Sequence, residues 1–308
     1  MPFKCKECGK EFDTQKDLHK HFKSHGLIIG EYYVKNYQRK DLLTGDLLPF
    51  NDVESYFLKD FRSENSFKLW CESGKITKEY ILDIFKKRID SKGWNEFPCE
   101  TEIKTCSSCF LPEIKYIKKY FGSCFSLAKE LGVNLILKDN FLSCENINSQ
   151  EIEKRMKIAI DTREQLPFDF KNKAIMKLDV GDYTALDNKY SNTYVDRKNP
   201  QDFIQTITSG FDRFSRELER VKELDAYLFI VVEDSIENLK NPNRRDFHKA
   251  NVKYVFSKMN DFQHKYPNNC QFVFADNRDM AKKLVLKILY NGKNFWGVDL
   301  QYLLDNKK

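Results

Sequence analysis

Two cysteines and two histidines near the start of the chain restrict the fold of its first 26 residues more than any other feature. Cys5 and Cys8 are separated by two residues, twelve residues follow before His21, and three more precede His25. Two thiolates on a tight turn and two imidazoles one helical turn apart can complete a tetrahedral Zn²⁺ site. A segment this short cannot bury enough apolar surface to fold alone, so we expect zinc to hold it together.

This spacing, with apolar residues at Phe12 and Leu18, resembles that of the two-Cys/two-His zinc fingers. The resemblance implies a ββα fold for residues 1–26. It places three side chains where such fingers contact DNA bases, namely Thr14, Asp17 and Lys20. His19 lies outside the ligand spacing, and we expect it to face solvent. A finger that binds protein instead of DNA is an open alternative.

Composition excludes several classes of protein. The 308 residues include 52 lysines and arginines against 46 aspartates and glutamates, which gives a net charge of +6 and permits a polyanionic partner without requiring one. No segment approaches the ~18 apolar residues of a membrane span, and the first residues have no signal-peptide core, so we expect no membrane association. The nine cysteines are sparse and odd in number, which fits a reducing, intracellular compartment.

The middle of the chain is predicted to be helical. Residues 27–74 form a connecting region without an assigned fold, and residues 75–145 contain helices expected at 77–90, 112–120 and 126–131. This second stretch resembles the helical repeat found in phage homing endonucleases, through Phe97-Pro98, Leu111-Pro112, Tyr120-Phe121-Gly122-Ser123 and Ala128-x-x-Leu131-Gly132. The resemblance implies a small α-helical DNA-binding module. The alternative is that these helices only pack together and do not bind DNA.

Cysteines in the same stretch suggest a second metal site. Two residues separate Cys106 from Cys109, and Cys99 lies upstream. A complete zinc site would need a fourth ligand such as Cys124 or Cys144. The alternative is that these cysteines are small buried apolar residues.

Residues 151–291 alternate short apolar runs with amphipathic segments, a pattern typical of an α/β sheet layer. Strands are expected at 157–161, 193–196, 227–233 and 271–275, and helices at 210–224, 252–266 and 280–290. Residues 292–308 are expected to form a C-terminal tail. The chain is therefore predicted to contain several domains, of which the last is α/β.

Acidic residues near these strands form the most informative pattern. Asp161 ends the first strand, and Asp182 lies far enough before Asp196 to come from the adjoining strand of a hairpin. Asp196 and Lys198 are two apart on a strand, so both side chains leave by the same face. Converging carboxylates repel unless a cation joins them, and all-oxygen ligation favours Mg²⁺ or Mn²⁺. Lys198 would then either have a lowered pKa or serve as a fixed positive donor, and both roles suit orienting a water for attack on a phosphodiester.

The surrounding motifs resemble those of the XPF-family nuclease domain, over roughly residues 156–290. They occur in the order Asp161-x-Arg163-Glu164, Gly181-Asp182, Asp196-Arg197-Lys198-x-x-x-Asp202, Arg213-Phe214-x-Arg216-Glu217-Leu218, and the apolar run 228–233. The resemblance implies a restriction-endonuclease-like α/β fold.

It also implies the roles of the site residues. Asp182 and Asp196 would be metal ligands, with Asp161 a third acid near the metal, directly or through water. Glu164 and Arg163 would shape the site, Lys198 would handle the water, Asp202 would orient the strand, and Arg213 and Arg216 would meet the DNA backbone. The family usually has glutamate where Asp196 stands, a difference of one methylene.

Together these expectations describe a Mg²⁺-dependent endonuclease of double-stranded DNA. The mixture of modules favours site-specific, homing-type cleavage, in the cytoplasm of a bacterial host or in a nucleus. Few residues follow the nuclease domain, where relatives carry a helix-hairpin-helix module, so we expect the protein to be monomeric or weakly dimeric without DNA. A second copy of the chain would then join on DNA. A nuclease of branched DNA and a non-cleaving DNA-binding protein are the alternatives.

Overall fold

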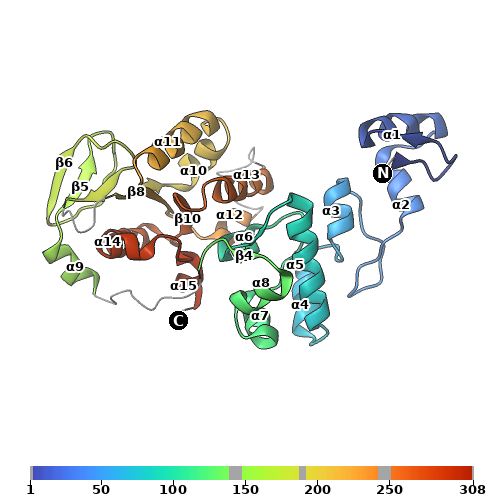
Figure 1. The fold of residues 1–308 in the computed structure, drawn as a ribbon, viewed down its shortest axis with the longest axis horizontal. Helices are drawn as coiled ribbons and strands as arrows, with labels where there is room; N and C mark the ends of the chain where they lie inside the picture. Colours follow the sequence, from blue (N-terminus) through green and yellow to red (C-terminus); the bar gives the residue numbers. More distant parts are fainter. Residues whose placement is uncertain (1–2, 139–147, 187–191, 242–250, 307–308) are drawn as a thin grey trace. The chain divides into compact units, whose positions relative to one another are not determined.

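The computed structural model describes residues 3–138, 148–186, 192–241 and 251–306 of the chain (Figure 1). The chain divides into two compact units. The N-terminal unit comprises Met1–Gly93 and Ser107–Pro112, and the C-terminal unit comprises Trp94–Cys106 and Glu113–Lys308. Among the described residues, no helix is long and apolar enough to cross a membrane.

The N-terminal unit begins with the ββα arrangement expected from the cysteine and histidine spacing. Strand β1 (Phe3–Lys4) pairs antiparallel with β2 (Glu11–Phe12), and helix α1 (Gln15–His21) follows, extended by the 3₁₀ turn η1 (Phe22–His25). The side chain of Thr14 accepts a hydrogen bond from the backbone N–H of Asp17, which caps the first turn of α1.

The connecting region extends the core of this first segment. Helices α2 (Ile29–Asn36) and α3 (Val53–Leu58) contribute aromatic side chains to it. The ring of Tyr32 stacks on that of Phe22 at 3.7 Å between centroids, and its hydroxyl accepts a hydrogen bond from the backbone N–H of Lys6. A core shared with later residues explains how so short a segment is packed.

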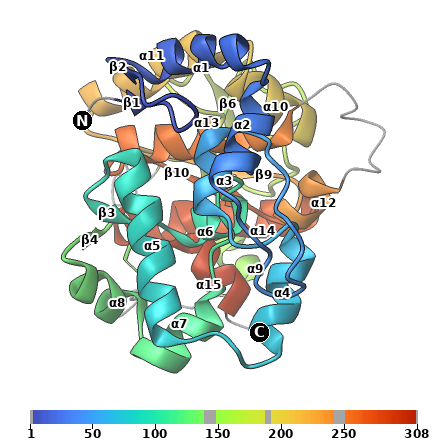
Figure 2. The same ribbon diagram turned by 90° about the vertical axis from the view of Figure 1, so that its right-hand side faces the viewer.

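Two longer helices complete the N-terminal unit. Helix α4 (Glu64–Glu72) buries Trp70, and α5 (Lys78–Lys92) begins at the capping side chain of Thr77 and ends at Gly93, which has a left-handed φ of 64° (Figure 2). The helix predicted at 77–90 is therefore present.

The C-terminal unit starts with short elements. Strand β3 (Glu96–Phe97) pairs in parallel with β4 (Asn134–Leu135), and between them lie α6 (Glu100–Thr105), α7 (Ile114–Phe121) and α8 (Cys124–Leu131). The helices predicted at 112–120 and 126–131 are confirmed. The boundary between the units passes through the segment 75–145, so that α5 belongs to one unit and α6 to α8 belong to the other.

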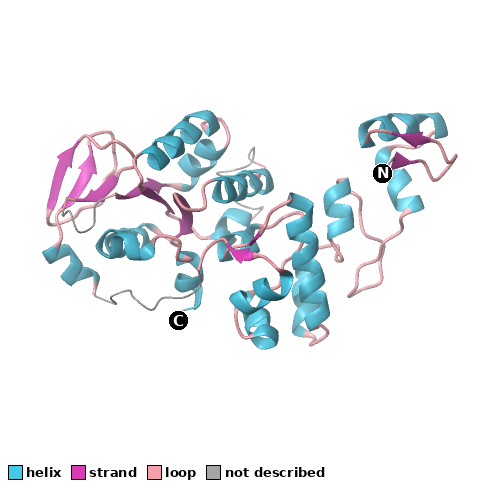
Figure 3. Ribbon diagram, in the orientation of Figure 1, coloured by secondary structure: helices cyan, strands magenta, loops and turns pink. Residues whose placement is uncertain are grey.

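A six-stranded sheet organises the rest of this unit (Figure 3). Its strand order is β10-β9-β8-β7-β5-β6, and β7 runs antiparallel to both of its neighbours while the other pairs are parallel. The strands are β5 (Ile158–Asp161), β6 (Lys173–Met176), β7 (Tyr183–Ala185), β8 (Thr193–Lys198), β9 (Tyr227–Val232) and β10 (Cys270–Phe274). All four predicted strands are confirmed, and β6 and β7 are additional.

Helices cover both faces of the sheet (Figure 1). Strand β9, next to the edge strand β10, is buried throughout, and its side chains alternate between the two cores. One face packs against α9 (Ser149–Arg155), α14 (Arg278–Asn291) and α15 (Leu300–Asn306). The other packs against α10 (Pro200–Ile207), α11 (Phe211–Glu223), α12 (Ile236–Lys240) and α13 (Val252–Lys265). A parallel-rich sheet covered on both faces is the predicted α/β architecture.

Residues 292–306 are packed into the domain and do not form the C-terminal tail predicted for residues 292–308. The 3₁₀ turn η4 (Gly292–Phe295) and α15 place Phe295, Val298 and Leu300 in the core of the sheet. The side-chain oxygen of Gln271 accepts a hydrogen bond from the backbone N–H of Leu300 at 2.8 Å. The apolar residues of this short segment therefore complete the core of the domain.

Candidate functional site

The hairpin formed by β7 and β8 brings Asp182 opposite Asp196. Tyr183 pairs with Val195 in the antiparallel register, so the residue just before β7 faces Asp196 on β8. The backbone N–H of Asp182 donates to the carbonyl of Val195 at 2.8 Å, and the Asp182 carboxylate accepts from the N–H of Arg197 at 2.8 Å. The predicted hairpin placement of Asp182 is thus confirmed.

A glycine is needed just before this acid. Gly181 has a φ of 64°, and a Cβ there would lie 3.0 Å from the carbonyl oxygen of Val195 and 3.0 Å from the side chain of Leu228. A larger residue would be strained by the left-handed backbone, and its Cβ would require Val195 or Leu228 to shift.

Lys198 and Asp196 form a partly buried ion pair. Lys198 Nζ lies 2.7 Å from Asp196 Oδ1, and Asp196 is only 2% exposed. The other oxygen, Asp196 Oδ2, is buried and has no hydrogen-bond partner within the part of the chain that the structure describes. An unpaired buried carboxylate oxygen is costly, and a cation is the partner that suits it.

The electrostatics of the hairpin agree with this arrangement. Burial, and then the negative charge of Asp196, raise the pKa of Asp182 to about 9. Burial lowers the pKa of Lys198, but the charges of Asp196 and Asp182 raise it more, so that it lies above its ordinary value. Of the two roles considered for Lys198, this arrangement of side chains favours the positively charged donor.

Asp161 is held by a different set of partners. Its carboxylate is 2.6 Å from Arg163 Nε and accepts from the backbone N–H of Leu178 at 2.6 Å. Burial raises the pKa of Asp161, but these hydrogen bonds lower it more. The structure therefore brings Asp182, Asp196 and Lys198 together and pairs Asp161 with Arg163, while the backbone N–H of Asp161 donates to the Asp182 carbonyl at 2.8 Å.

Glu164 and Arg197 form a buried network beside the hairpin. Arg197 Nη2 lies 3.0 Å from Glu164 Oε1, and Arg197 Nη1 lies 3.4 Å from Glu233 Oε1. Arg278 joins the same Glu233 oxygen at 2.6 Å. This network fixes the loop after β5 against the ends of β8 and β9.

The remaining predicted residues lie near the helices that follow β8. Asp202, in the first turn of α10, accepts from the side chain of Asn199 at 2.7 Å, shortly after the end of β8. Arg213 and Arg216 are exposed on α11, and neither forms an ion pair within the described ranges. Glu217, on the same helix, had no predicted role.

Glu217 reaches the turn that carries Asp182. Its Oε1 accepts a hydrogen bond from the backbone N–H of Gly181 at 3.2 Å, across 36 positions of sequence. Burial, and then the charge of Asp196, raise the pKa of Glu217. No spacing in the sequence marks this contact, because β7, β8 and α10 lie between Gly181 and α11 along the chain.

The N-terminal unit carries a separate metal-ligand cluster. The ligand atoms of Cys5, Cys8, His21 and His25 lie within 4.8 Å of one another, and no other group of three or more such ligands occurs among the described residues. This geometry fits a tetrahedral zinc ion. His19 is half-buried, and its Nε2 lies 3.0 Å from the Tyr33 hydroxyl, so the expectation that it faces solvent is wrong.

The three predicted base-contact positions lie at the start and along the outside of α1. Thr14 Oγ1 donates to Asp17 Oδ2 at 2.7 Å, and Lys20 Nζ lies 3.0 Å from Asp17 Oδ1. Thr14 and Lys20 are exposed and Asp17 is half-buried.

The second predicted zinc site has no complete ligand group among the described residues. Cys99, Cys106, Cys109 and Cys124 are all buried, which is how small apolar side chains behave. Cys144 lies outside the described residues.

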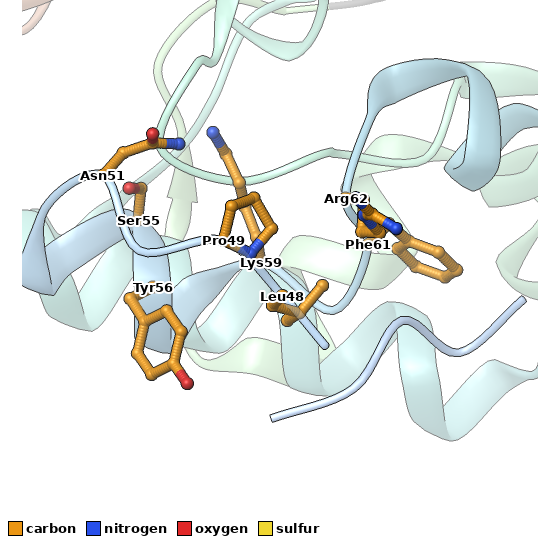
Figure 4. Close-up of a pocket in the computed structure, with 8 residues that line it drawn as sticks. All are labelled: Leu48, Pro49, Asn51, Ser55, Tyr56, Lys59, Phe61 and Arg62. Atoms are coloured by element: carbon orange, nitrogen blue, oxygen red, sulfur yellow. The ribbon is translucent and has the colours of Figure 1, made fainter. Parts of the chain in front are cut away.

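A pocket in the N-terminal unit is too small to bind a substrate. Its volume is about 20 Å³, which is room for one water molecule (Figure 4). It is lined by Leu48, Pro49, Asn51, Ser55, Tyr56, Lys59, Phe61 and Arg62.

Comparison with known families assigns the region that contains the hairpin. Residues 148–288 match the family model of the ERCC4 domain. This part of the chain is an ERCC4 domain. The predicted resemblance to XPF-family nucleases is confirmed over these residues, and an ERCC4 domain implies a DNA nuclease.

Solved structures similar to the chain include XPF from Aeropyrum pernix, alone and in complex with DNA. The identities are 19% and 20%, and the TM-score is 0.33 in both cases. Each match covers 44% of this chain and 63% of the XPF chain. No curated protein matches the chain.

Proposed function

We propose that the protein is a divalent-metal-dependent DNA endonuclease whose active site is the β7–β8 hairpin of the ERCC4 domain. The observation that carries this proposal is the group of Asp182, Asp196 and Lys198, in which Asp196 is buried and its Oδ2 has no partner among the described residues. Surface acids in solvated loops would not leave such an atom buried.

Asp182 and Asp196 would hold the ion, and their oxygen donors fit Mg²⁺ or Mn²⁺. When bound, the ion would polarise the scissile phosphate and stabilise charge on the departing 3′ oxygen. Asp161 stays close through its backbone bond to Asp182 and would act on the ion through water.

Lys198 would place the attacking water. Its ammonium group is held by Asp196 on the same strand face, so its remaining N–H groups can donate to a water in line with the scissile bond. Arg213 and Arg216, exposed on α11, would contact the phosphate backbone on either side. The products would be 5′-phosphate and 3′-hydroxyl ends.

Two further elements would bring the enzyme to double-stranded DNA. The cluster of Cys5, Cys8, His21 and His25 would hold Zn²⁺ and make residues 1–26 a zinc finger, with Thr14, Asp17 and Lys20 toward the bases. The helices of the segment 75–145 would add backbone contacts. Because one finger covers only ~3 base pairs, site-specific cleavage of homing type would need both elements, and a second copy of the chain could join on the DNA.

Cleavage of branched DNA is the second candidate, and the ERCC4 match favours it. A library of linear duplexes and a splayed fork, each incubated with Mg²⁺ or Mn²⁺ and either the parent or Asp196→Asn protein, would separate the two. We expect the parent to cut a linear site and the variant to cut nothing. Cutting of the fork alone would support the second candidate, and no cutting of any substrate by the parent would contradict both.

A further inference from the structure

Helix α11 supplies an acidic side chain to the ion-binding turn. Phe214, Leu218 and Val221 on this helix are buried in the core, which fixes the helix against the sheet. Glu217 lies beside this buried stripe and is half-buried, and its Oε1 accepts the backbone N–H of Gly181 at 3.2 Å. Gly181 directly precedes Asp182, so the helix is tied to the turn that carries an ion ligand.

Several charged side chains interact around this turn. The carboxylate of Asp196 interacts electrostatically with those of Asp182 and Glu217, Lys198 interacts with all three, and Arg163 interacts with Asp182 and Glu217. A divalent cation bound by Asp182 and Asp196 would offset the repulsion that Asp196 exerts on the other two carboxylates. Asp196, which is 2% exposed, independently indicates such a ligand, because its Oδ2 has no partner among the described residues.

We propose that Glu217 is a further acidic residue of the ion site, beside Asp182, Asp196 and Asp161, which positions the Gly181–Asp182 turn and adds its negative charge to the surroundings of the ion. This inference rests on the proposed function of the hairpin. Glu217 is a positioning residue, since its hydrogen bond goes to the backbone of the turn. Its charge acts on the ion at longer range, through the water that Mg²⁺ and Mn²⁺ keep in their coordination shells.

A glutamine substitution separates the two parts of this role. The amide oxygen of Glu217→Gln can still accept the Gly181 N–H, but it carries no charge. Glu223→Gln on the same helix is the matched control, because Glu223 is exposed at the far end of α11. Glu217→Asp keeps the charge one methylene further from the turn.

The experiment measures Mn²⁺ binding by calorimetry and metal-free thermal unfolding, on the full chain loaded with zinc. We expect Glu217→Gln to bind Mn²⁺ about 10–100-fold more weakly, which is the usual loss for an outer-shell carboxylate. Its metal-free melting temperature should be equal or higher, because repulsion from Asp196 is removed. Glu217→Asp should keep more affinity than Glu217→Gln, and Glu223→Gln should match the parent in both measurements.

Three outcomes would overturn the inference. They are parental Mn²⁺ affinity in Glu217→Gln, weaker binding by Glu217→Asp than by Glu217→Gln, and a lowered metal-free melting temperature in Glu217→Gln, which would indicate a purely structural role. Asp196→Asn distinguishes this failure from failure of the proposed function. If Asp196→Asn also binds Mn²⁺ as the parent does, the ion site itself is misplaced.

Discussion

Replacing Arg197 should destabilise the ERCC4 domain strongly, although this arginine lies between two residues assigned to catalysis. Its guanidinium group sits between Glu164 and Glu233, and the three side chains are only 7%, 4% and 9% exposed. Arg197→Met keeps the length of the side chain and removes its charge. Glu164 would then be a buried carboxylate without its cation, while Glu233 would keep Arg278.

The size of the effect follows from the burial. Removing one partner of a buried ion pair costs about 3–5 kcal/mol. In a domain of 150–250 residues, each kcal/mol lowers the melting temperature by about 2–4 °C. A decrease of roughly 10 °C is therefore expected, and Glu164→Gln added to Arg197→Met should recover part of it, because the unpaired charge is gone.

Calorimetry of the full chain measures the melting temperature of the ERCC4 domain directly. The transition of this domain is identified as the one whose melting temperature rises when Mn²⁺ is added. The exposed Arg213→Met is the control, since Arg213 has no ion-pair partner within the described residues and should change the melting temperature little. A decrease of less than ~2 °C for Arg197→Met, or a double variant less stable than the single one, would refute the argument from buried charge.

Two other predictions concern sites outside the hairpin. Removal of zinc by a chelator, or Cys8→Ala, should unfold residues 3–25 and weaken DNA binding while the ERCC4 domain stays folded; purified protein without stoichiometric zinc by metal analysis would contradict this. Burial, and then the charge of Asp299, raise the pKa of Glu100 to about 8, so Glu100 keeps its proton in the folded state where the unfolded chain has released it. Stability should therefore fall as the pH rises from about 4.5 to about 8, and Glu100→Gln should remove this fall, by up to a few kcal/mol at pH 8 and nothing at pH 4.5. Identical pH profiles of unfolding for parent and variant would exclude this effect.

The sheet could be predicted as far as its strands carry buried apolar runs. β5, β8, β9 and β10 have such runs and were found from the sequence. β6 is an exposed edge strand, with Ile175 70% exposed, and β7 has only three residues, so neither shows a readable period.

The candidate site divides in the same way. Asp182, Asp196 and Lys198 could be brought together from spacing, because a hairpin and a strand have simple geometry. Glu217 could not, because its contact with Gly181 depends on how α11 packs. The contribution of residues 27–58 to the core of the first segment could not be predicted for the same reason. Only the structure shows that the ring of Tyr32 stacks on that of Phe22.

The central claim is that Asp196 holds the ion and Lys198 places the water at one active site. The most direct measurement is Mg²⁺-dependent DNA cleavage by Lys198→Ala, with Mn²⁺ binding measured on the same protein and Asp196→Asn beside it. We predict that Lys198→Ala binds Mn²⁺ as the parent does but cuts ~10²–10⁴-fold more slowly, which is the usual loss of one positioned donor. Asp196→Asn should lose both binding and cleavage. Cleavage by Lys198→Ala at nearly the parental rate would contradict the assignment of the catalytic strand.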